Sequence, residues 1–379
     1  MRFPDPDLIA DPYPSFADWL AEHPIWRDPA TGHWVLTRHD DVRSVLKNST
    51  AFSSRAMGET GNPLPLLTDD PPKHTQLRKL VDRAFTVRML RQMEDWVVKL
   101  ADDMVGALPA GAPVDIVQDL TIPLPVAVIS RMMGIPNARA EDFKRWSDAL
   151  TGTLAGSSLA DREKDVMEMA MYFQSLIPER RDDPGDDLVS AVVNAEIDGQ
   201  RLTDQEIVGF NILLLIAGNE TTTNLLGNLL NILVERPDLY ERLRAEPARI
   251  DAAIEETLRF DPPVQFLMRK ATTAMAFHGQ TVAPGENVTV VMAAANRDPR
   301  SYEQPEVFDL DRPKNHHHTF GFGIHFCIGA PLARLEARLA MRALLARFPA
   351  IRRADDPDRV NERVASPLLR GFHHLWVAF

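Results

Sequence analysis

The single cysteine of this 379-residue chain lies in a segment rich in glycine and phenylalanine, Phe320-Gly321-Phe322-Gly323-Ile324-His325-Phe326-Cys327-Ile328-Gly329. Apolar residues at helical spacing predict a helix directly after it, from about Ala330 to Phe348. A thiolate at the start of a helix is stabilised by free backbone N–H groups and by the positive end of the helix dipole. Gly321 and Gly323 permit backbone conformations that a side chain would block, and Gly329 would let a flat cofactor lie against the chain.

Two simpler roles for this cysteine have to be weighed. A lone cysteine is most often a buried and chemically inert side chain. It could also be a nucleophile paired with His325, which would lie on the same side of an extended loop. Nothing in the sequence supplies an oxyanion hole or an orienting carboxylate for such a pair, however. The context of the cysteine favours a different role.

The pattern Phe-x-x-Gly-x-His-x-Cys-x-Gly resembles the haem-binding signature of the cytochrome P450 family, and each signature position is filled. That family holds its haem iron through a cysteine thiolate. The resemblance implies that Cys327 is the axial ligand of haem b (iron protoporphyrin IX), with Phe320, Gly321 and Gly329 against the cofactor. It also implies a mainly α, single-domain fold over residues 1–379, a helical bundle around the haem with small β-sheets.

The patterns along the chain agree with a mainly helical fold. Helical periodicity covers residues 13–23, 40–48, 72–84, 87–108 and 120–133. A longer helix is predicted from Thr203, which forms a capping box with Glu206, to about Glu235. The runs 25–27 and 33–37 flank a turn and predict a hairpin, and residues 266–292 alternate as strands do.

The middle of the long predicted helix carries the run Ile216-Ala217-Gly218-Asn219-Glu220-Thr221-Thr222. A glycine inside a helix costs about 1 kcal/mol relative to alanine, so Gly218 needs a reason. It could be a packing glycine, with Thr221 bonded back to its own helix. In the context of the chain, the run resembles the family's oxygen-binding groove. Ala217 and Gly218 would then form the groove, and Glu220 and Thr221 the acid–alcohol pair that delivers protons to dioxygen.

Two further motifs follow the family's order. Glu256 and Arg259 match its structural Glu-x-x-Arg, which Arg312 would complete as a buried cluster, although Glu255 is also placed to pair with Arg259. Haem propionates need cationic or hydrogen-bonding partners when they are buried. The resemblance assigns this role to four residues: His74, Arg78, Arg269 and His325. The run His316–His318 is predicted to be a solvated loop rather than a metal site.

The charge of the chain limits its partners. The net charge of -12 argues against a nucleic-acid binder. One cysteine allows no intrachain disulfide, and no apolar run approaches the roughly 20 residues of a membrane span, so we expect a cytoplasmic protein. Basic residues nevertheless gather in two helices, and we predict that they merge into one positive patch for a ferredoxin. They are Lys73, Arg78, Lys79, Arg83, Arg88 and Arg91 in the first stretch, and Arg334, Arg338, Arg342 and Arg347 after the cysteine.

The implied activity is that of a monooxygenase, which inserts one atom of O2 into a hydrophobic small molecule by C–H hydroxylation or epoxidation. Electrons would come from NAD(P)H through a ferredoxin reductase and a ferredoxin. A terpenoid, steroid, fatty acid or polyketide would suit the apolar pocket, whose predicted lining is Met57, Leu64, Leu213, Leu214, Val264, Leu267 and Leu368. A peroxide-driven enzyme and a non-catalytic haem-thiolate sensor remain as alternatives.

Overall fold

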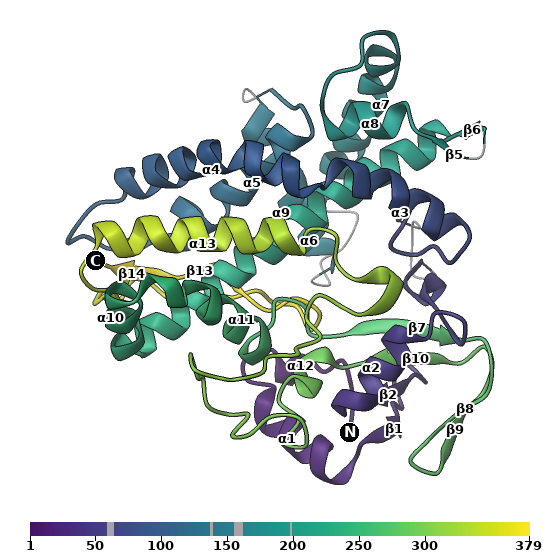
Figure 1. The fold of residues 1–379 in the computed structure, drawn as a ribbon. Coiled ribbons are helices and arrows are strands. Elements are labelled where there is room, and N and C mark those ends of the chain that lie inside the picture. The colour runs from purple at the N-terminus through teal and green to yellow at the C-terminus, as the bar shows by residue number, and fades with distance from the viewer. Residues whose placement is uncertain (59–63, 137–138, 155–161, 198) are drawn as a thin grey trace.

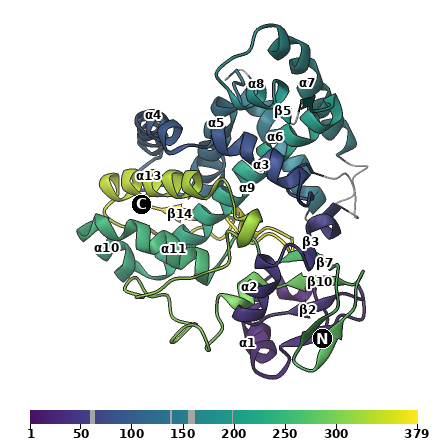
Figure 2. The same ribbon diagram turned by 45° about the vertical axis from the view of Figure 1, so that its right-hand side comes forward.

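The computed structural model describes residues 1–58, 64–136, 139–154, 162–197 and 199–379. Most of its helices gather in one large part of the molecule (Figures 1 and 2). The largest sheet lies to one side together with the N-terminus and with the helices Tyr13–Glu22, His39–Lys47 and Met292–Ala295. Over the described residues, no helix combines the length and the apolar composition that crossing a bilayer requires.

The helices are α1 (Tyr13–Glu22), α2 (His39–Lys47), α3 (Lys73–Ala84), α4 (Val87–Ala107), α5 (Pro123–Met132), α6 (Ala140–Leu154), α7 (Glu163–Asp182), α8 (Leu188–Val193), α9 (Asp204–Glu235), α10 (Pro237–Ala245), α11 (Ile250–Phe260), α12 (Met292–Ala295) and α13 (Ala330–Arg347). The strands are β1 (Ile25–Arg27), β2 (Trp34–Leu36), β3 (Phe52–Ser53), β4 (Val114–Asp115), β5 (Glu196–Ile197), β6 (Gln200–Arg201), β7 (Leu267–Ala271), β8 (Met275–Phe277), β9 (Gln280–Val282), β10 (Asn287–Val290), β11 (Arg352–Arg353), β12 (Glu362–Arg363), β13 (Phe372–His374) and β14 (Trp376–Ala378).

The central element is α9, whose 32 residues begin at the predicted capping box of Thr203 and Glu206. From Thr222 to Val234 its side chains are all buried, so this half is apolar or internally hydrogen-bonded on every side. Helices α5, α6, α7, α11 and α13 pack around it. Helix α13, which follows the cysteine, lies along α4 (Figure 1). These helices thus form a continuous core.

The sheets join distant parts of the chain. The largest has the strand order β1-β2-β10-β7-β3, and in it β2 pairs parallel with β10 while β7 pairs antiparallel with β10 and β3. The predicted hairpin is confirmed, because Trp26 faces Val35 across antiparallel β1 and β2. Near the C-terminus, β14 lies between β11 and β4.

Most predicted helices lie within two residues of their observed ends, and the predicted helix at 120–133 differs most. There a π-helical turn at Val117–Thr121 precedes α5, which begins at Pro123. Helices α6, α7, α8 and α10 were not predicted. In α7, Pro178 lies inside the helix, where a proline usually ends one. Tertiary packing of its buried face, which includes Phe173 and Ile177, outweighs this local signal.

Candidate cofactor site

The cysteine loop, residues 320–329, is closed by its own backbone. Cys327 donates its N–H to the carbonyl of Phe320 at 2.8 Å, and Phe326 donates to Gly323 at 3.1 Å. Gly321 and Gly323 both adopt a positive φ, near 70°, which glycine alone adopts without strain. A Cβ at Gly323 would also lie 2.9 Å from the carbonyl oxygen of Leu46 in α2. The glycines therefore fix the turn and its close approach to α2.

The thiol of Cys327 lies where α13 begins. The backbone N–H groups of Gly329 and Ala330 donate toward its sulfur, although burial outweighs them and raises the pKa of the thiol. By accessible area the residue is nevertheless exposed. The residue therefore keeps accessible surface although protein surrounds its sulfur. This arrangement suits a ligand that binds on the open side of the sulfur and favours the thiolate.

Four cationic or potentially cationic side chains gather beside this loop: His74, Arg78, Arg269 and His325. The rings of His74 and His325 are 4.1 Å apart. Burial, then His74, Arg269 and Arg78, lower the pKa of His325 to about 3. The four side chains therefore lie close enough to repel one another's charge.

Two buried members of the cluster, His74 and Arg269, have no carboxylate partner among the described residues, whereas Arg78 pairs with Asp82. His74 is 2% exposed, and neither of its ring nitrogens has a hydrogen-bond partner. Arg269, which is 3% exposed, donates only to the sulfur of Met57 and the carbonyl of Met268, and burial lowers its pKa to about 10. Buried cations without partners are costly. The cluster therefore fits an anionic group such as a haem propionate.

Arg78 and His325 are already partly engaged. Arg78 donates Nη1 to the carbonyl of Phe326 at 2.6 Å and Nε to Asp82 at 2.9 Å. His325 lies 2.8 Å from the hydroxyl of Ser54 through Nε2. Arg78 therefore braces the cysteine loop as well as facing the cationic cluster.

The run 216–222 in α9 combines an exposed groove position at Ala217 with a packing glycine and a threonine bonded back to its own helix, the two interpretations that its sequence allowed. Ala217 is exposed although it lies within a largely buried helix, and Thr221 donates its hydroxyl to the carbonyl of Ala217 at 3.0 Å. A Cβ on Gly218 would lie 3.0 Å from Ile129 of α5, so this glycine allows the two helices to pack closely. Glu220 lies 3.3 Å from the hydroxyl of Ser147 in α6. Roles for these side chains in oxygen chemistry stay predictions.

The predicted glutamate–arginine cluster is confirmed, and Glu256 is its carboxylate. Glu256 is 1% exposed and accepts from Arg259 at 2.8 and 2.9 Å and from Arg312 at 3.0 and 3.1 Å. Glu255 turns the other way and accepts from Arg334 of α13 at 2.6 and 2.9 Å. The two neighbouring glutamates thus anchor different parts of the protein.

The prediction of a solvated histidine loop at 316–318 holds for His316, which is exposed, but is wrong for His317 and His318. His318 is 2% exposed, its ring lies 4.2 Å from that of His39, and burial lowers its pKa to about 3. His317 is bonded to Glu255 at 3.3 Å. The part of the chain that the structure describes contains no cluster of metal-ligating side chains, here or elsewhere. These histidines join the loop before the cysteine to α2 and α11.

The residues predicted to line the substrate pocket lie in three separate apolar clusters. Leu213 and Leu214 are buried in the main core with Leu64 against it, Val264 and Leu267 pack on a second cluster, and Leu368 packs on a third. Met57 lies at the cationic cluster, where its sulfur is 3.6 Å from Arg269. Two of the segments are joined directly, because Gln265 donates its N–H to Leu368 at 2.9 Å and Val264 bridges to Leu369.

A positioning residue that was missed is Asn228. It is fully buried in α9, and its amide nitrogen donates to the carbonyls of Asp261 and Arg370, both at 2.9 Å. Asn224, one turn earlier, fills the space beside Gly371, where a Cβ would lie 1.8 Å from its amide oxygen. The repeated asparagines in an otherwise apolar helix were the available signal, since buried amides need partners.

The predicted positive patch is smaller than its sequence suggested. Carboxylates from other elements pair with several of its members: Glu206 with Lys73 at 2.8 Å, Glu255 with Arg334, and Asp251 with Arg338 at 2.7 Å. Among the described side chains, the members without a carboxylate partner are Lys79, Arg88, Arg91, Arg342 and Arg347. The side chain of Arg83 lies outside the described residues.

Comparisons with known proteins agree with this geometry. The family model for cytochrome P450 matches residues 155–371. The chain is 38% identical over 371 residues to cytochrome P450 109 of Bacillus spizizenii, which covers 96% of this chain and 91% of that protein. It is 37% identical to the erythromycin C-12 hydroxylase of Saccharopolyspora erythraea, over 94% of this chain and 93% of that protein. The crystal structure of CYP109E1 from Bacillus megaterium in complex with testosterone superposes with a TM-score of 0.87 at 36% identity, over 97% of this chain and 99% of that one.

Proposed function

The chain belongs to the cytochrome P450 family of haem monooxygenases, and from this premise we propose that it inserts one oxygen atom of O2 into a steroid-sized hydrophobic molecule. The observation that carries the proposal is the exposed Cys327 at the start of α13, beside buried His74 and Arg269, which have no carboxylate partner among the described residues. That combination suits a flat cofactor with an iron to ligate and two carboxylates to neutralise.

We propose that the cofactor is haem b. Cys327 would hold the iron, and His74, Arg78, Arg269 and His325 would bind the propionates. Because the only cysteine serves as the iron ligand, no second thiol is available to attach a haem covalently. Haem with a thiolate ligand supplies the activation of dioxygen, since electron donation from sulfur favours O–O cleavage.

We further propose that Thr221 and Glu220 move protons to the oxygen side of the cofactor. The hydroxyl of Thr221 is held by the carbonyl of Ala217, and it can turn to donate toward the open side of the helix. Glu220 is tethered to Ser147, whose hydroxyl also accepts from Asn219 at 2.6 Å. These polar groups connect α9 to α6, and in the proposal Glu220 supplies the proton that Thr221, the next residue of the helix, passes on.

The substrate part of the proposal rests on the apolar lining and on two relatives. CYP109E1 binds testosterone in its crystal structure, and a second relative is an erythromycin C-12 hydroxylase. The experiment is a spin-state titration of the haem protein with steroids, macrolides and fatty acids of matched solubility. We expect steroids to give the largest shift at the lowest concentration. A preference for fatty acids over all steroids would contradict this substrate class.

Electrons would arrive from NAD(P)H through a ferredoxin reductase and a ferredoxin, in a cytoplasm that keeps Cys327 reduced. The unpaired cations Lys79 and Arg342 are the sharper test of ferredoxin docking, since reversing Arg338 also breaks its pair with Asp251. Charge reversal at Lys79 and Arg342 should slow reduction by ferredoxin and spare peroxide-supported activity. If the protein forms product with peroxide but with no ferredoxin, it is a peroxide-driven enzyme. If it forms no product with either, it is a haem-thiolate sensor.

A further inference from the structure

A second cleft lies away from the cysteine loop, where the N-terminal part of the chain meets its C-terminal segment. It is lined by α1, by the last turns of α9, by the end of α11 and by residues 363 and 370. Its volume is about 590 Å³, within the usual range of small-molecule sites. It shares no lining residue with the predicted haem or substrate residues. Phe16, Leu20 and Ile232 give it a mostly apolar wall.

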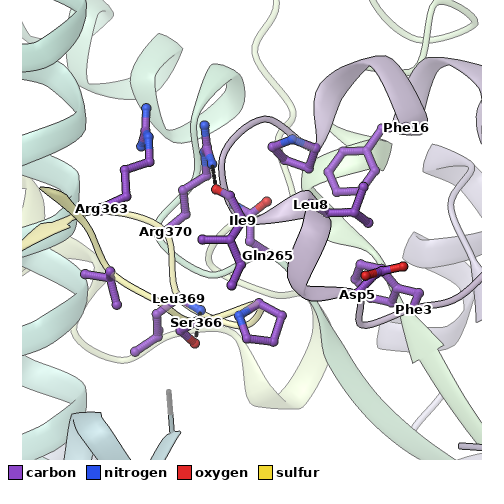
Figure 3. Close-up of a pocket in the computed structure, with 14 residues that line it drawn as sticks. Phe3, Asp5, Leu8, Ile9, Phe16, Gln265, Arg363, Ser366, Leu369 and Arg370 are labelled. Atoms are coloured by element: carbon purple, nitrogen blue, oxygen red, sulfur yellow. Dashed lines mark hydrogen bonds between the residues drawn. The ribbon is translucent and has the colours of Figure 1, made fainter. Parts of the chain in front are cut away.

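The floor of the cleft is a buried ionic cluster centred on Asp261. The carboxylate accepts from Tyr13 at 2.5 Å and from Arg370 at 2.5 Å, and Arg363 lies 3.8 Å away. Arg370 also reaches the carbonyl of Ile9 at 2.9 Å. Figure 3 shows Arg363 and Arg370 side by side, with both guanidinium groups pointing the same way. The small cavity in Figure 3 shares Phe16 and both arginines with the cleft, but at about 20 Å³ it has room for little more than a water molecule.

A third guanidinium completes the floor. Arg297 lies between two aromatic rings, 3.4 Å from the centroid of Tyr13 and 3.7 Å from that of Phe260. It donates to the carbonyl of Phe260 at 2.6 and 3.0 Å, and no carboxylate of the described residues forms an ion pair with it. Three guanidinium groups therefore share one buried carboxylate.

The positive charge at the floor is incompletely balanced. The Nη1 of Arg363 is buried and has no hydrogen-bond partner. Burial lowers the pKa of both Arg297 and Arg363, whereas Arg370, which is closely paired, has a raised pKa. Three more carboxylates line the cleft, those of Asp11, Glu235 and Glu306. Asp11 also acts on Arg370 and Glu235 on Arg363, although Glu235 is bound to Arg353 at 2.8 Å. The cleft therefore combines guanidinium groups around one buried carboxylate with further carboxylates and an apolar wall.

We propose that this cleft binds a small amphipathic monocarboxylate. Its carboxylate would lie against Arg363 and Arg297, where a planar guanidinium can bind it through two hydrogen bonds. Its apolar body would cover Phe16, Leu20 and Ile232. The carboxylates of Asp11, Glu235 and Glu306 repel ligands that carry several negative charges, so we expect inorganic phosphate and polyanions not to bind. The site also touches the substrate side, because Arg370 donates its N–H to Pro263 at 2.8 Å, directly before Val264.

The test is calorimetric titration of 4-butylbenzoate into the haem protein, with the iron saturated by 4-phenylimidazole so that the haem pocket is filled. We expect binding of one benzoate per chain and at least tenfold weaker binding in Arg363→Met. The matched control is Arg359→Met, which removes an arginine of the same segment that pairs with Asp356 at 2.7 Å and does not line the cleft. It should bind as the wild type does. Inorganic phosphate and 4-butylbenzamide should give no comparable heat.

A second variant guards against loss of folding in the first. Ala17 is exposed and lines the cleft, so Ala17→Phe fills the space without disturbing buried atoms. It should weaken binding of 4-butylbenzoate by a similar factor while the thermal midpoint stays unchanged. Equal affinity in the wild type, Arg363→Met and Ala17→Phe would overturn the proposal, and so would the absence of binding to the wild type.

Discussion

The cysteine loop and the segments predicted to line the substrate pocket are held in place in opposite ways. The loop is closed within ten residues by its own hydrogen bonds and by two glycines of positive φ. The substrate-lining segments depend on partners far along the chain, such as Asn228, which holds Asp261 and Arg370 together. The comparison teaches that the conformation around Cys327 is a local property, whereas the arrangement of the predicted substrate-lining segments depends on how distant parts of the chain pack.

The largest effect should come from the loop itself. Replacing the cysteine, Cys327→His, removes the only thiolate, so the red-shifted Soret band of the reduced carbon monoxide complex and all monooxygenase turnover should be lost. His325→Gln, two residues away, should keep the band. An unchanged band in Cys327→His would show that the ligand is not in this loop.

The stability of the fold around the loop also depends on neighbouring elements. Replacing each of the two glutamates of α11 shows how much each contributes to the free energy of unfolding. Glu256→Gln leaves Arg259 and Arg312 buried without their charge partner, and we expect a loss of about 3 to 5 kcal/mol in the free energy of unfolding. Glu255→Gln, at a partly exposed pair, should cost about 1 kcal/mol. Denaturant unfolding of the two haem-bound variants checks this. Equal losses would mean that burial of Glu256 does not set its importance.

A change at Thr221 in α9 should alter the coupling of NADPH use to product formation rather than the stability of the protein. Thr221→Ala removes the proposed proton donor, so the yield of product per NADPH should fall by about tenfold or more, with electrons diverted to peroxide. The matched control is Thr223→Ala. Thr223 lies on another face of α9, where its hydroxyl donates to the carbonyl of Thr121. If Thr221→Ala keeps the coupling of the wild type, Thr221 does not donate protons and only packs within its helix.

The substrate side should show a smaller and more selective change. Asn228→Ala frees the carbonyls of Asp261 and Arg370, so substrate affinity should fall several-fold, equivalent to about 1 kcal/mol, and the ratio of products should change. Asn231→Ala, which loses a contact with Arg353 near the end of α9, should leave the substrate spin-state shift as it is. If both variants behave alike, Asn228 acts only on stability.

The smallest effect concerns pH. Burial alone would raise the pKa of Glu255, but His317 and Arg334 hold it at about 2, below its usual 4.5. A lowered carboxyl pKa stabilises the fold above the unfolded value, and this contribution is lost as pH falls from about 4.5 through 2. The difference in stability between the wild type and Glu255→Gln should therefore shrink between pH 6 and pH 3. A constant difference would mean that the ion pair contributes nothing.

Much of the framework could be predicted because its signals are local. The capping box of Thr203 fixed the start of α9, and the apolar repeat after the cysteine fixed α13. The neutralisation of the basic patch could not be predicted, since Glu206 and Asp251 come from other elements. The burial of His318 could not be predicted for the same reason, because its partner His39 lies 279 residues earlier in the chain.

The sequence by itself determined the cysteine loop and the helix that follows it, because hydrogen bonds, glycine conformation and helix periodicity act within a few residues. The tertiary structure decided which glutamate binds Arg259, which arginines keep a free charge, and how Asn228 joins the segments near the substrate. Those outcomes depend on contacts between residues that are far apart in sequence. A side chain's partner, and hence its charge and its role, is set only when such segments pack together.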